Sequence, residues 1–288
     1  MARTLLCGLI GAGIQRSLAP ALQEEEARQQ GIRLHYQLID IDAAGVGPEA
    51  LPTLIEAARV MGYAGLNITF PCKQLVIPLL DALSEEARAI GAVNTVVRDG
   101  SRLVGHNTDG SGWSWGFRRA LPKADLSRVV LLGAGGAGSA CADAVLRLGA
   151  EQLTIVDVEP ARAAALAGRL NDHFASGRAS AGTDVAAALR DATGLIQATP
   201  VGMAKLPGMP FPEQLLRPSM WLSEVVYVPL ETQLLMAARR LGCATADGGH
   251  MNVGQAVGGF KLFTGLDADV ARMDAHFRRL VTSDRRTS

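Results

Sequence analysis

Three glycines and one acid in the middle of the chain have the spacing of a dinucleotide-binding motif. Gly133, Gly135 and Gly138 follow the apolar run VVLL at 129–132, and Asp157 ends the next apolar run. In such a motif the first glycine permits a tight turn, the second lets the backbone approach a pyrophosphate, and the third lets a helix lie close to a strand. The acid then accepts hydrogen bonds from the adenosine ribose. These residue types predict binding of a dinucleotide.

The elements that must position these residues follow in the required order. The run 129–132 is typical of a strand buried on both faces, and 153–156 predicts a second such strand. Between them, an apolar helical face ends at Gly149, where a glycine stops a helix; the face is formed by Ala137, Cys141, Ala144, Val145 and Leu148. A plain tight turn is the alternative interpretation of the glycines. The order of strand, turn, helix, strand and acid favours the nucleotide site.

Two polar segments in the first half of the chain suggest what a bound dinucleotide would be used for. Lys73 closes the segment GLNITFPCK, and Asp109 lies in the glycine-bounded segment GHNTDGSG. Oxidation of an alcohol by hydride transfer needs a group that moves the hydroxyl proton. A lysine partly removed from water can do this, and a neighbouring aspartate would orient it. The alternatives are an ordinary solvated lysine and an Asx-turn.

Composition narrows the class of protein. The chain has 288 residues, 28 basic and 28 acidic side chains, and 48% hydrophobic residues. This length and apolar fraction predict a substantial core in two domains, and the balanced charge argues against nucleic acid and anionic membrane as partners. We expect a cytoplasmic protein without a leader or membrane span. The scattered cysteines predict reduced, mostly buried thiols and no metal site; they are Cys7, Cys72, Cys141 and Cys243.

Strand and helix patterns alternate along both halves, which predicts a doubly wound α/β fold. Among the local expectations are a helix over 71–80, a loop over 107–112 followed by a helix over 113–120, and a loop over 247–251 before a final helix from Val253. Residues after Thr282 are polar and are expected to fray.

Seven ordered blocks resemble the shikimate/quinate dehydrogenase family over essentially the whole chain. They are NITFPCK (67–73), GAVNTV (91–96), GHNTDG (105–110), LLGAGGAG (131–138), QATPVGM (197–203), VVYVPLETQLL (225–235) and GGHMNVGQA (248–256). The resemblance implies an N-terminal α/β substrate domain, a Rossmann NAD(P)-binding domain, and C-terminal helices that return to the first domain. We expect these parts to span 1–115, 116–250 and 251–288, in a monomer or homodimer that acts on a small cyclic carboxylate.

The resemblance also implies roles for individual residues. Lys73 and Asp109 would form the catalytic acid–base pair on the C3 hydroxyl of shikimate or quinate. Ser17 would bind the substrate carboxylate, and the remaining substrate contacts would be Thr69, Asn94, Tyr227 and Gln255. The cofactor contacts would be Gly133, Ala134, Gly135, Gly136, Ala137, Gly138, Asp157, Arg162, Thr199, Val201, Met203, Val226, Gly248 and Met251. A core position is the alternative for Met251.

One departure from the family pattern concerns the cofactor. Members that prefer NADP usually carry Asn-Arg-Thr after the second Rossmann strand, where the Arg and Thr bind the 2′-phosphate. This chain has Asp157, Val158 and Glu159 there, so the cation is absent and two negative charges are added. We therefore expect NAD to be preferred and NADP to be used more weakly, with Arg162 softening the preference.

A second departure concerns the substrate carboxylate. The family usually has two hydroxyls separated by one residue, whereas here Ala19 follows Ser17 and Leu18. A missing hydrogen bond to a charged group costs about 1.5–3 kcal/mol, or roughly 10- to 150-fold in affinity. A water or Arg16 would compensate. Otherwise an aminoshikimate-type analogue is an alternative substrate, and a non-catalytic sensor of a metabolite or NAD is an alternative function. Glu224, where the family more often has Asp, is a smaller change.

Overall fold

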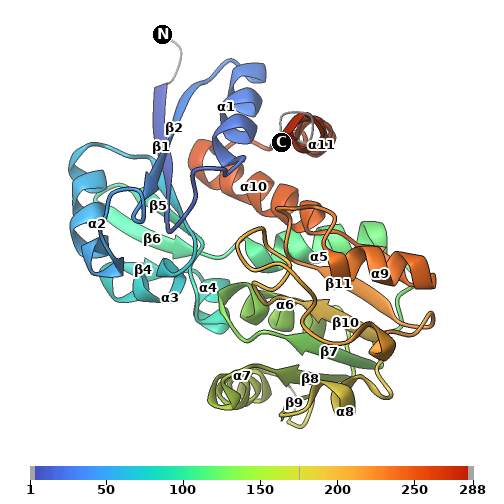
Figure 1. The fold of residues 1–288 in the computed structure, drawn as a ribbon. Coiled ribbons are helices and arrows are strands. Elements are labelled where there is room, and N and C mark those ends of the chain that lie inside the picture. The colour runs from blue at the N-terminus through green and yellow to red at the C-terminus, as the bar shows by residue number, and fades with distance from the viewer. Residues whose placement is uncertain (1–3, 175, 285–288) are drawn as a thin grey trace. The chain divides into compact units, whose positions relative to one another are not determined.

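The computed structural model describes residues 4–174 and 176–284, and the chain divides into two compact units (Figure 1). Unit 1 holds the chain up to Thr108 and from Gln255 onward, and unit 2 holds Asp109–Gly254. The sequence-based expectation was 1–115, 116–250 and 251–288. The C-terminal segment thus belongs to the same unit as the N-terminal one.

Unit 1 is built on a six-stranded mixed sheet with the strand order β2-β1-β3-β5-β6-β4. Strands β1, β2 and β3 run parallel, β5 is antiparallel to both its neighbours, and β4 pairs with β6 in parallel. The elements are β1 (Thr4–Gly11), α1 (Ala19–Gln29), β2 (Arg33–Asp40), the 3-10 helix η1 (Pro48–Ala50), α2 (Leu51–Val60), β3 (Gly65–Ile68), α3 (Cys72–Leu75), the 3-10 helix η2 (Ile77–Leu79), β4 (Ala82–Leu83), α4 (Glu85–Ile90), β5 (Thr95–Asp99), β6 (Arg102–His106), most of α10 (Gly248–Thr264) and α11 (Val270–Asp284).

The sheet of unit 1 has an apolar core on each face because the side chains of its strands alternate. On β1, Cys7 and Leu9 face a cluster that includes Phe260 and Phe263 of α10, whereas Ile10 faces the cluster of α2, α3 and α4. Two aromatic side chains from the end of the chain therefore complete a core whose strands come from its beginning. The predicted return of the C-terminal helices to the first domain is confirmed.

Unit 2 is built on a six-stranded parallel sheet with the order β12-β11-β10-β7-β8-β9, which is the 3-2-1-4-5-6 order of a Rossmann fold counted within the unit. Its elements are α5 (Asp109–Ala120), β7 (Arg128–Leu132), α6 (Gly136–Arg147), β8 (Gln152–Val156), α7 (Pro160–His173), β9 (Ala179–Gly182), α8 (Val185–Leu189), β10 (Gly194–Gln197), the 3-10 helix η3 (Glu213–Leu215), β11 (Trp221–Glu224), α9 (Gln233–Leu241), β12 (Ala244–Ala246) and the first turns of α10.

Helices cover both faces of this second sheet. Val129 and Leu131 of β7 face the core of α5, α6 and α7, and Val130 and Leu132 face the core of α8 and α9. The continuous apolar run 129–132 is thus explained by burial on both sides. The prediction of a doubly wound α/β unit is confirmed.

Three local expectations were wrong, each for a physical reason. The helix expected over 71–80 breaks into α3 and η2, because Pro78 cannot donate a backbone hydrogen bond inside a helix. Helix α5 begins at Asp109 instead of 113, and α10 begins at Gly248 instead of 253. In both cases the glycines that suggested a loop lie inside the helix. Fraying was expected for 283–288, but α11 continues to Asp284; the remaining positions, 285–288, lie outside the described residues.

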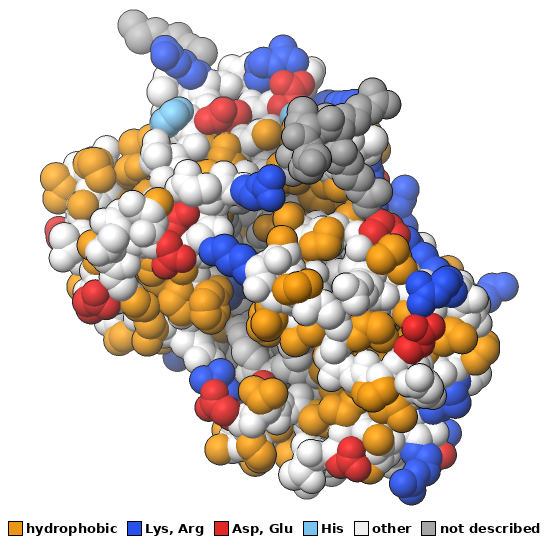
Figure 2. All heavy atoms as spheres, in the orientation of Figure 1, with side chains coloured by type: hydrophobic (Ala, Val, Ile, Leu, Met, Phe, Trp, Pro, Cys, Tyr) orange, Lys and Arg blue, Asp and Glu red, His pale blue; other side chains and the backbone are white. Residues whose placement is uncertain are grey.

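The four cysteines are buried, and the face seen in Figure 2 carries charges of both signs. None of the four cysteines forms a disulfide, and all four side chains are buried. On the face seen in Figure 2, basic and acidic side chains are interspersed and neither sign forms a continuous field. None of the helices in the described part of the chain combines the length and apolar character that a bilayer crossing needs.

Candidate functional site

The glycine-rich turn of unit 2 connects β7 to α6. Gly133 has a φ of +96°, a backbone conformation that favours glycine, and its N–H donates to the carbonyl of Val156 at 2.8 Å. A Cβ on Gly138 would overlap the carbonyl oxygen of Gly133, so a glycine is needed where α6 approaches the strand. Gly135 stands at the N-cap of α6 with no atom within 4 Å of where a Cβ would lie.

That geometry fits a dinucleotide pyrophosphate. The N–H groups at the start of α6 lack partners within the helix and carry the positive end of its dipole, which favours an anion. The space beside Gly135 is the room that the phosphates require. The other residues expected here, Ala134, Gly136 and Ala137, lie in the same turn and first helical positions. The structure brings this whole predicted group together.

Asp157 is tied to the same turn from the end of β8. Its Oδ2 accepts a hydrogen bond from the N–H of Ala134 at 2.7 Å, and its Oδ1 accepts one from Glu159 at 2.9 Å. The next residue, Val158, is 97% exposed, so this edge of the turn faces solvent. Arg162, the cation expected to soften the charge here, forms an ion pair with Glu159 at 2.9 Å.

Polar residues of unit 1 gather at one edge of its sheet, where β3 and β6 end and β5 begins. Asn94 is their hub: its Nδ2 donates to Thr108 Oγ1 at 3.0 Å, and its Oδ1 accepts from the Thr108 N–H at 2.8 Å and from Thr95 Oγ1 at 2.9 Å. Thr108 Oγ1 also donates to the carbonyl of Gln255 at 3.1 Å, which brings α10 to this edge. Asn67 donates to Thr95 Oγ1 at 3.0 Å.

Thr69 and Lys73 follow β3 at the same edge. The Thr69 N–H donates to the carbonyl of Ile10 at 2.9 Å, so the segment after β3 stays attached to β1. Lys73 lies in the single turn of α3, half-buried, and its carbonyl accepts from Val93 N–H at 2.8 Å beside Asn94. The backbone therefore joins the lysine segment to the asparagine hub.

Ser17 lies in the turn before α1, which a buried carboxylate organises. Asp40 at the end of β2 accepts from the N–H groups of Gly13 and Ile14, both at 2.9 Å. Burial alone would raise the pKa of Asp40, but these and further hydrogen bonds outweigh burial and lower it. Ser17 Oγ accepts from the N–H of Ala19 at 3.3 Å, so the alanine contributes only its backbone to the turn.

Asp109 and Tyr227 belong to unit 2. Asp109 is the first residue of α5 and is 4% exposed. Burial raises the pKa of Tyr227, a hydrogen bond with Asn252 of α10 opposes that rise, and the charge of Asp109 adds to it. Asp109, Asn252 and Tyr227 are therefore neighbours within unit 2. Asn252 was not among the predicted residues, although the GGHMNVGQA block contains it.

The loops after β10 and β11 carry most of the other predicted cofactor contacts. Thr199, Val201 and Met203 follow β10, and Val226 follows β11. A Cβ on Gly248, the first residue of α10, would clash with the carbonyl of Val226. Met251, for which a core position was the alternative, is 6% exposed and packs in the same core as Trp113.

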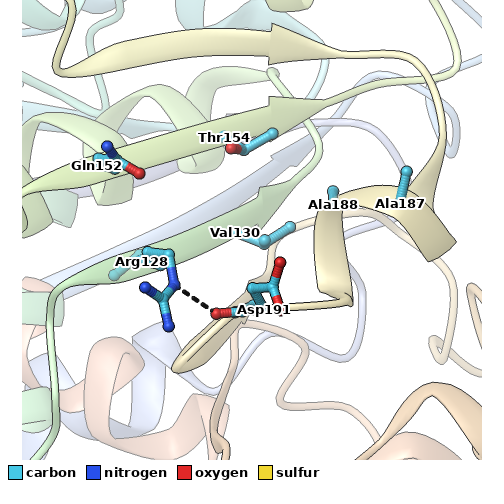
Figure 3. A pocket seen from close by; sticks show the side chains of 9 residues that line it. Arg128, Val130, Gln152, Thr154, Ala187, Ala188 and Asp191 are labelled. Carbon is cyan, nitrogen blue, oxygen red and sulfur yellow. Dashed lines mark hydrogen bonds between the residues drawn. The ribbon is translucent and has the colours of Figure 1, made fainter.

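A cavity at the opposite edge of the Rossmann sheet is distinct from these loops. It has a volume of about 150 Å³ and lies at the amino ends of β7 and β8, where Figure 3 shows Arg128, Gln152 and Asp191. Arg128 Nε donates to the carbonyl of Asp191 at 2.7 Å, which holds the guanidinium against the wall. Ligands of open α/β sheets bind at the carboxyl ends of the strands, so this cavity is not the candidate site.

Comparison with known proteins finds similar families for both parts of the chain. Residues 9–96 match the model of the shikimate dehydrogenase substrate binding domain, and residues 99–217 match that of the alanine dehydrogenase/PNT C-terminal domain. A shikimate dehydrogenase (NADP(+)) of Streptomyces avermitilis is 58% identical over 96% of this chain and 95% of its own. A quinate/shikimate dehydrogenase (NAD(+)) of Corynebacterium efficiens is 47% identical over 96% and 99%.

A solved structure is similar over the same extent. The quinate dehydrogenase of Corynebacterium glutamicum in complex with NAD superposes with a TM-score of 0.89 at 43% identity, covering 96% of this chain and 99% of that one. The likeness therefore includes both units and is not limited to the nucleotide-binding motif. The chain belongs to the shikimate/quinate dehydrogenase family of nicotinamide-dependent oxidoreductases.

Proposed function

We propose that the protein reversibly oxidises the C3 hydroxyl of shikimate, or of quinate, to the 3-dehydro acid. The observation that carries the proposal is the buried amide and hydroxyl network around Asn94, Thr95 and Thr108 at the sheet edge beside Lys73. Hydrogen-bonding groups fixed at one edge suit a ring that bears several hydroxyls. The names of the relatives supply the substrate class, and those names do not favour an aminoshikimate-type substrate or a sensor.

Oxidation of a secondary alcohol removes a proton from the hydroxyl oxygen and a hydride from the carbon that bears the hydroxyl. The nicotinamide cofactor, when bound, accepts the hydride. We assign the hydroxyl proton to Nζ of Lys73, and the reverse reaction returns it. Asp109, buried at the start of α5, would orient the lysine and balance its charge, because a nearby opposite charge favours the protonated lysine.

The substrate would be held through groups that are already ordered. Asn94, Thr69 and Gln255 are assigned to the ring hydroxyls, and Tyr227 to the same ring. Ser17 is assigned to the carboxylate, and its hydroxyl can donate while its oxygen accepts from Ala19 N–H. Since Ala19 has no hydroxyl, the carboxylate receives one side-chain donor fewer than the family pattern supplies. We therefore expect weak binding of shikimate and quinate.

We infer that NAD is preferred over NADP. Asp157 and Glu159 place two carboxylates at the ribose end of the turn, where a 2′-phosphate would add negative charge. Arg162, the nearby cation, forms an ion pair with Glu159. The relatives include one named for NADP and one named for NAD, and both match a similar share of this chain. Their names therefore do not decide the cofactor, and the inference rests on the charge at this turn.

The test is initial-rate formation of NADH and of NADPH with shikimate and quinate in parallel, with the Lys73→Ala variant beside the wild type. Turnover with NAD that the variant loses is the expected result. Faster turnover with NADP would overturn the cofactor inference alone. Absence of turnover with both acids and both cofactors would overturn the proposed activity.

A further inference from the structure

Two buried polar side chains stand opposite each other at the carboxyl ends of the central strands of unit 2. Gln197 ends β10 and Glu224 ends β11, and their Cα atoms are register partners in the parallel pairing. Gln197 is 0% exposed and Glu224 is 1% exposed. Burying a polar side chain without hydrogen-bond partners lowers the stability of a domain, so we expect both side chains to be hydrogen-bonded.

Each of the two side chains organises the loop that follows its own strand. Gln197 Nε2 donates to Thr199 Oγ1 at 2.8 Å and to the Val201 carbonyl at 2.9 Å. Its Oε1 accepts from Thr199 Oγ1 at 3.1 Å. The loop after β10, with three of the predicted cofactor contacts, is thereby folded around one amide.

Glu224 acts on the loop after β11 in the same manner, but with a carboxylate. Its Oε1 accepts from the N–H groups of Val225 at 2.9 Å and Val226 at 3.0 Å. Its Oε2 accepts from Thr232 Oγ1 at 2.9 Å, and Thr232 Oγ1 in turn caps α9 by accepting from Leu235 N–H at 3.1 Å. One side chain thus fixes both ends of the segment 225–232.

The other side of this segment is fixed as well. The Val226 carbonyl lies against Gly248, where a Cβ would clash, and Tyr227 is hydrogen-bonded to Asn252. The Val225 N–H is shared with the carbonyl of Gln197 at 3.0 Å, which joins the two loops. The segment therefore has little freedom as long as Glu224 holds the Val226 N–H and Thr232.

We propose that Glu224 is a positioning residue that holds Val226, one of the predicted cofactor contacts, after β11 in the second mononucleotide-binding half of the Rossmann sheet, where the nicotinamide end of the cofactor would bind. The inference rests on the proposed dehydrogenase function. Because Asp157 and the glycine-rich turn serve the adenosine and pyrophosphate end, a loss at Glu224 affects one end of the cofactor and spares the other. A merely structural role would affect both ends alike.

The experiment compares the affinities of NAD and of ADP-ribose, which lacks the nicotinamide ring, by calorimetry on the full chain. In Glu224→Ala, NAD affinity falls by roughly ten-fold or more, since the Val226 N–H and the Thr232 hydroxyl lose their acceptor. ADP-ribose affinity stays within about two-fold of the wild type. Glu224→Gln, whose amide oxygen can still accept from Val226, restores NAD binding.

Glu213→Ala is the matched control, because Glu213 is a partly exposed glutamate of η3 in the same unit, paired with Arg240. It leaves both affinities unchanged. Thr232→Val removes the hydroxyl that donates to Glu224 and keeps the branched shape. Like Glu224→Ala, it lowers the affinity for NAD and leaves the affinity for ADP-ribose unchanged. It therefore provides the same test if Glu224→Ala does not fold.

Amide hydrogen exchange of the cofactor-free protein gives a readout that needs no activity. The Val226 N–H exchanges faster in Glu224→Ala than in the wild type, and Glu224→Gln retains its protection. Equal weakening of NAD and ADP-ribose, or unchanged exchange at Val226, would overturn the inference. A wild-type protein that binds both ligands but oxidises neither acid would overturn the proposed function and leave the positioning role standing.

Discussion

The carboxylate of Asp157 accepts a hydrogen bond from the backbone N–H of Ala134, at 2.7 Å, across the turn that binds the pyrophosphate in this fold. The acid after β8 therefore stabilises the glycine-rich turn, in addition to the ribose contact proposed for it. A change at Asp157 should alter cofactor choice and the order of the turn together.

Asp157→Asn is expected to lower kcat/KM with NAD by roughly 10- to 150-fold, because a charged acceptor of ribose hydroxyls becomes neutral. The rate with NADP falls less, since one repulsive charge is removed. Steady-state rates with both cofactors measure the ratio. Glu159→Gln, which releases Arg162 from its ion pair, should raise the NADP rate alone. An unchanged NAD/NADP ratio in both variants would show that cofactor choice is made elsewhere.

Lys73→Ala is expected to reduce kcat by roughly 10²- to 10⁴-fold, the usual contribution of a positioned acid or base. The KM for NAD should stay near the wild-type value, because Lys73 lies in the other unit from the glycine-rich turn. Lys123→Ala, at an exposed position of unit 2, serves as the control for loss of a lysine charge. Retention of more than a tenth of the wild-type kcat in Lys73→Ala would remove the lysine from the proton transfer.

Ala19→Ser supplies the second hydroxyl that the family usually has in the turn proposed to bind the substrate carboxylate. The N–H of Ala19 donates to Ser17 Oγ, so the two positions are adjacent in space. A further hydrogen bond to the substrate carboxylate should lower the KM for shikimate by about ten-fold or more, with kcat little changed. Saturation kinetics on the two proteins measure this. An identical KM would place the carboxylate away from the turn.

Gly135→Ala separates the needs of folding from those of the cofactor. Its φ of −74° suits alanine and the space around it is open, so the melting temperature should not fall. The added methyl group takes room that the pyrophosphate needs, and NAD affinity should drop by roughly ten-fold or more. Gly168→Ala, which also meets open space in α7, is the control and should stabilise the protein by about 0.5–1 kcal/mol. Normal NAD binding in Gly135→Ala would contradict the assignment of the turn.

Burial raises the pKa of Glu224 to about 7, against 4.5 for an ordinary glutamate. Between these two pH values the Glu224 carboxyl keeps a proton in the folded protein, whereas the same carboxyl in the unfolded chain has released it. Between about pH 4.5 and pH 7 the free energy of unfolding should therefore decrease as pH rises, by on the order of 3 kcal/mol, and it should level off above that window. Denaturant titrations at several pH values measure the slope. Glu224→Gln cannot titrate, so an equal slope in that variant would assign the effect to another group.

The sequence predicts the elements whose patterns are local. The apolar runs 129–132 and 153–156 and the Asp99-Gly100 turn all became the expected strands and hairpin. The starts of α5 and α10 could not be predicted, because Gly110 and Gly112 in the one and Gly248 and Gly249 in the other favour loops in isolation. Their surroundings in the fold explain two of them: a Cβ on Gly248 would clash with the Val226 carbonyl, and the backbone of Gly112 is approached closely by Gly254.

The candidate site likewise contains residues that the sequence predicts and residues that it does not. Residue types and motif spacing were enough to nominate Lys73, Asp109 and Asp157. The role of Glu224 was not visible, because it depends on the pairing of β10 with β11 and on Thr232, which reaches back to the end of its strand. Contacts that depend on how strands pair do not appear as a periodic pattern in the amino-acid sequence.

Unit 1 needs both ends of the chain, since Phe260 and Phe263 fill a core that begins at Leu5. On the ribosome its sheet is made first, yet the aromatic side chains that cover one face emerge last. Unit 2 is continuous and can fold while synthesis proceeds. We therefore expect unit 2 to fold before unit 1 is complete. An mRNA truncated near its 3′ end would give a protein without Phe260 and Phe263, in which one apolar face of the unit 1 sheet is exposed. We expect such a protein to be degraded by the cell and to have no catalytic activity.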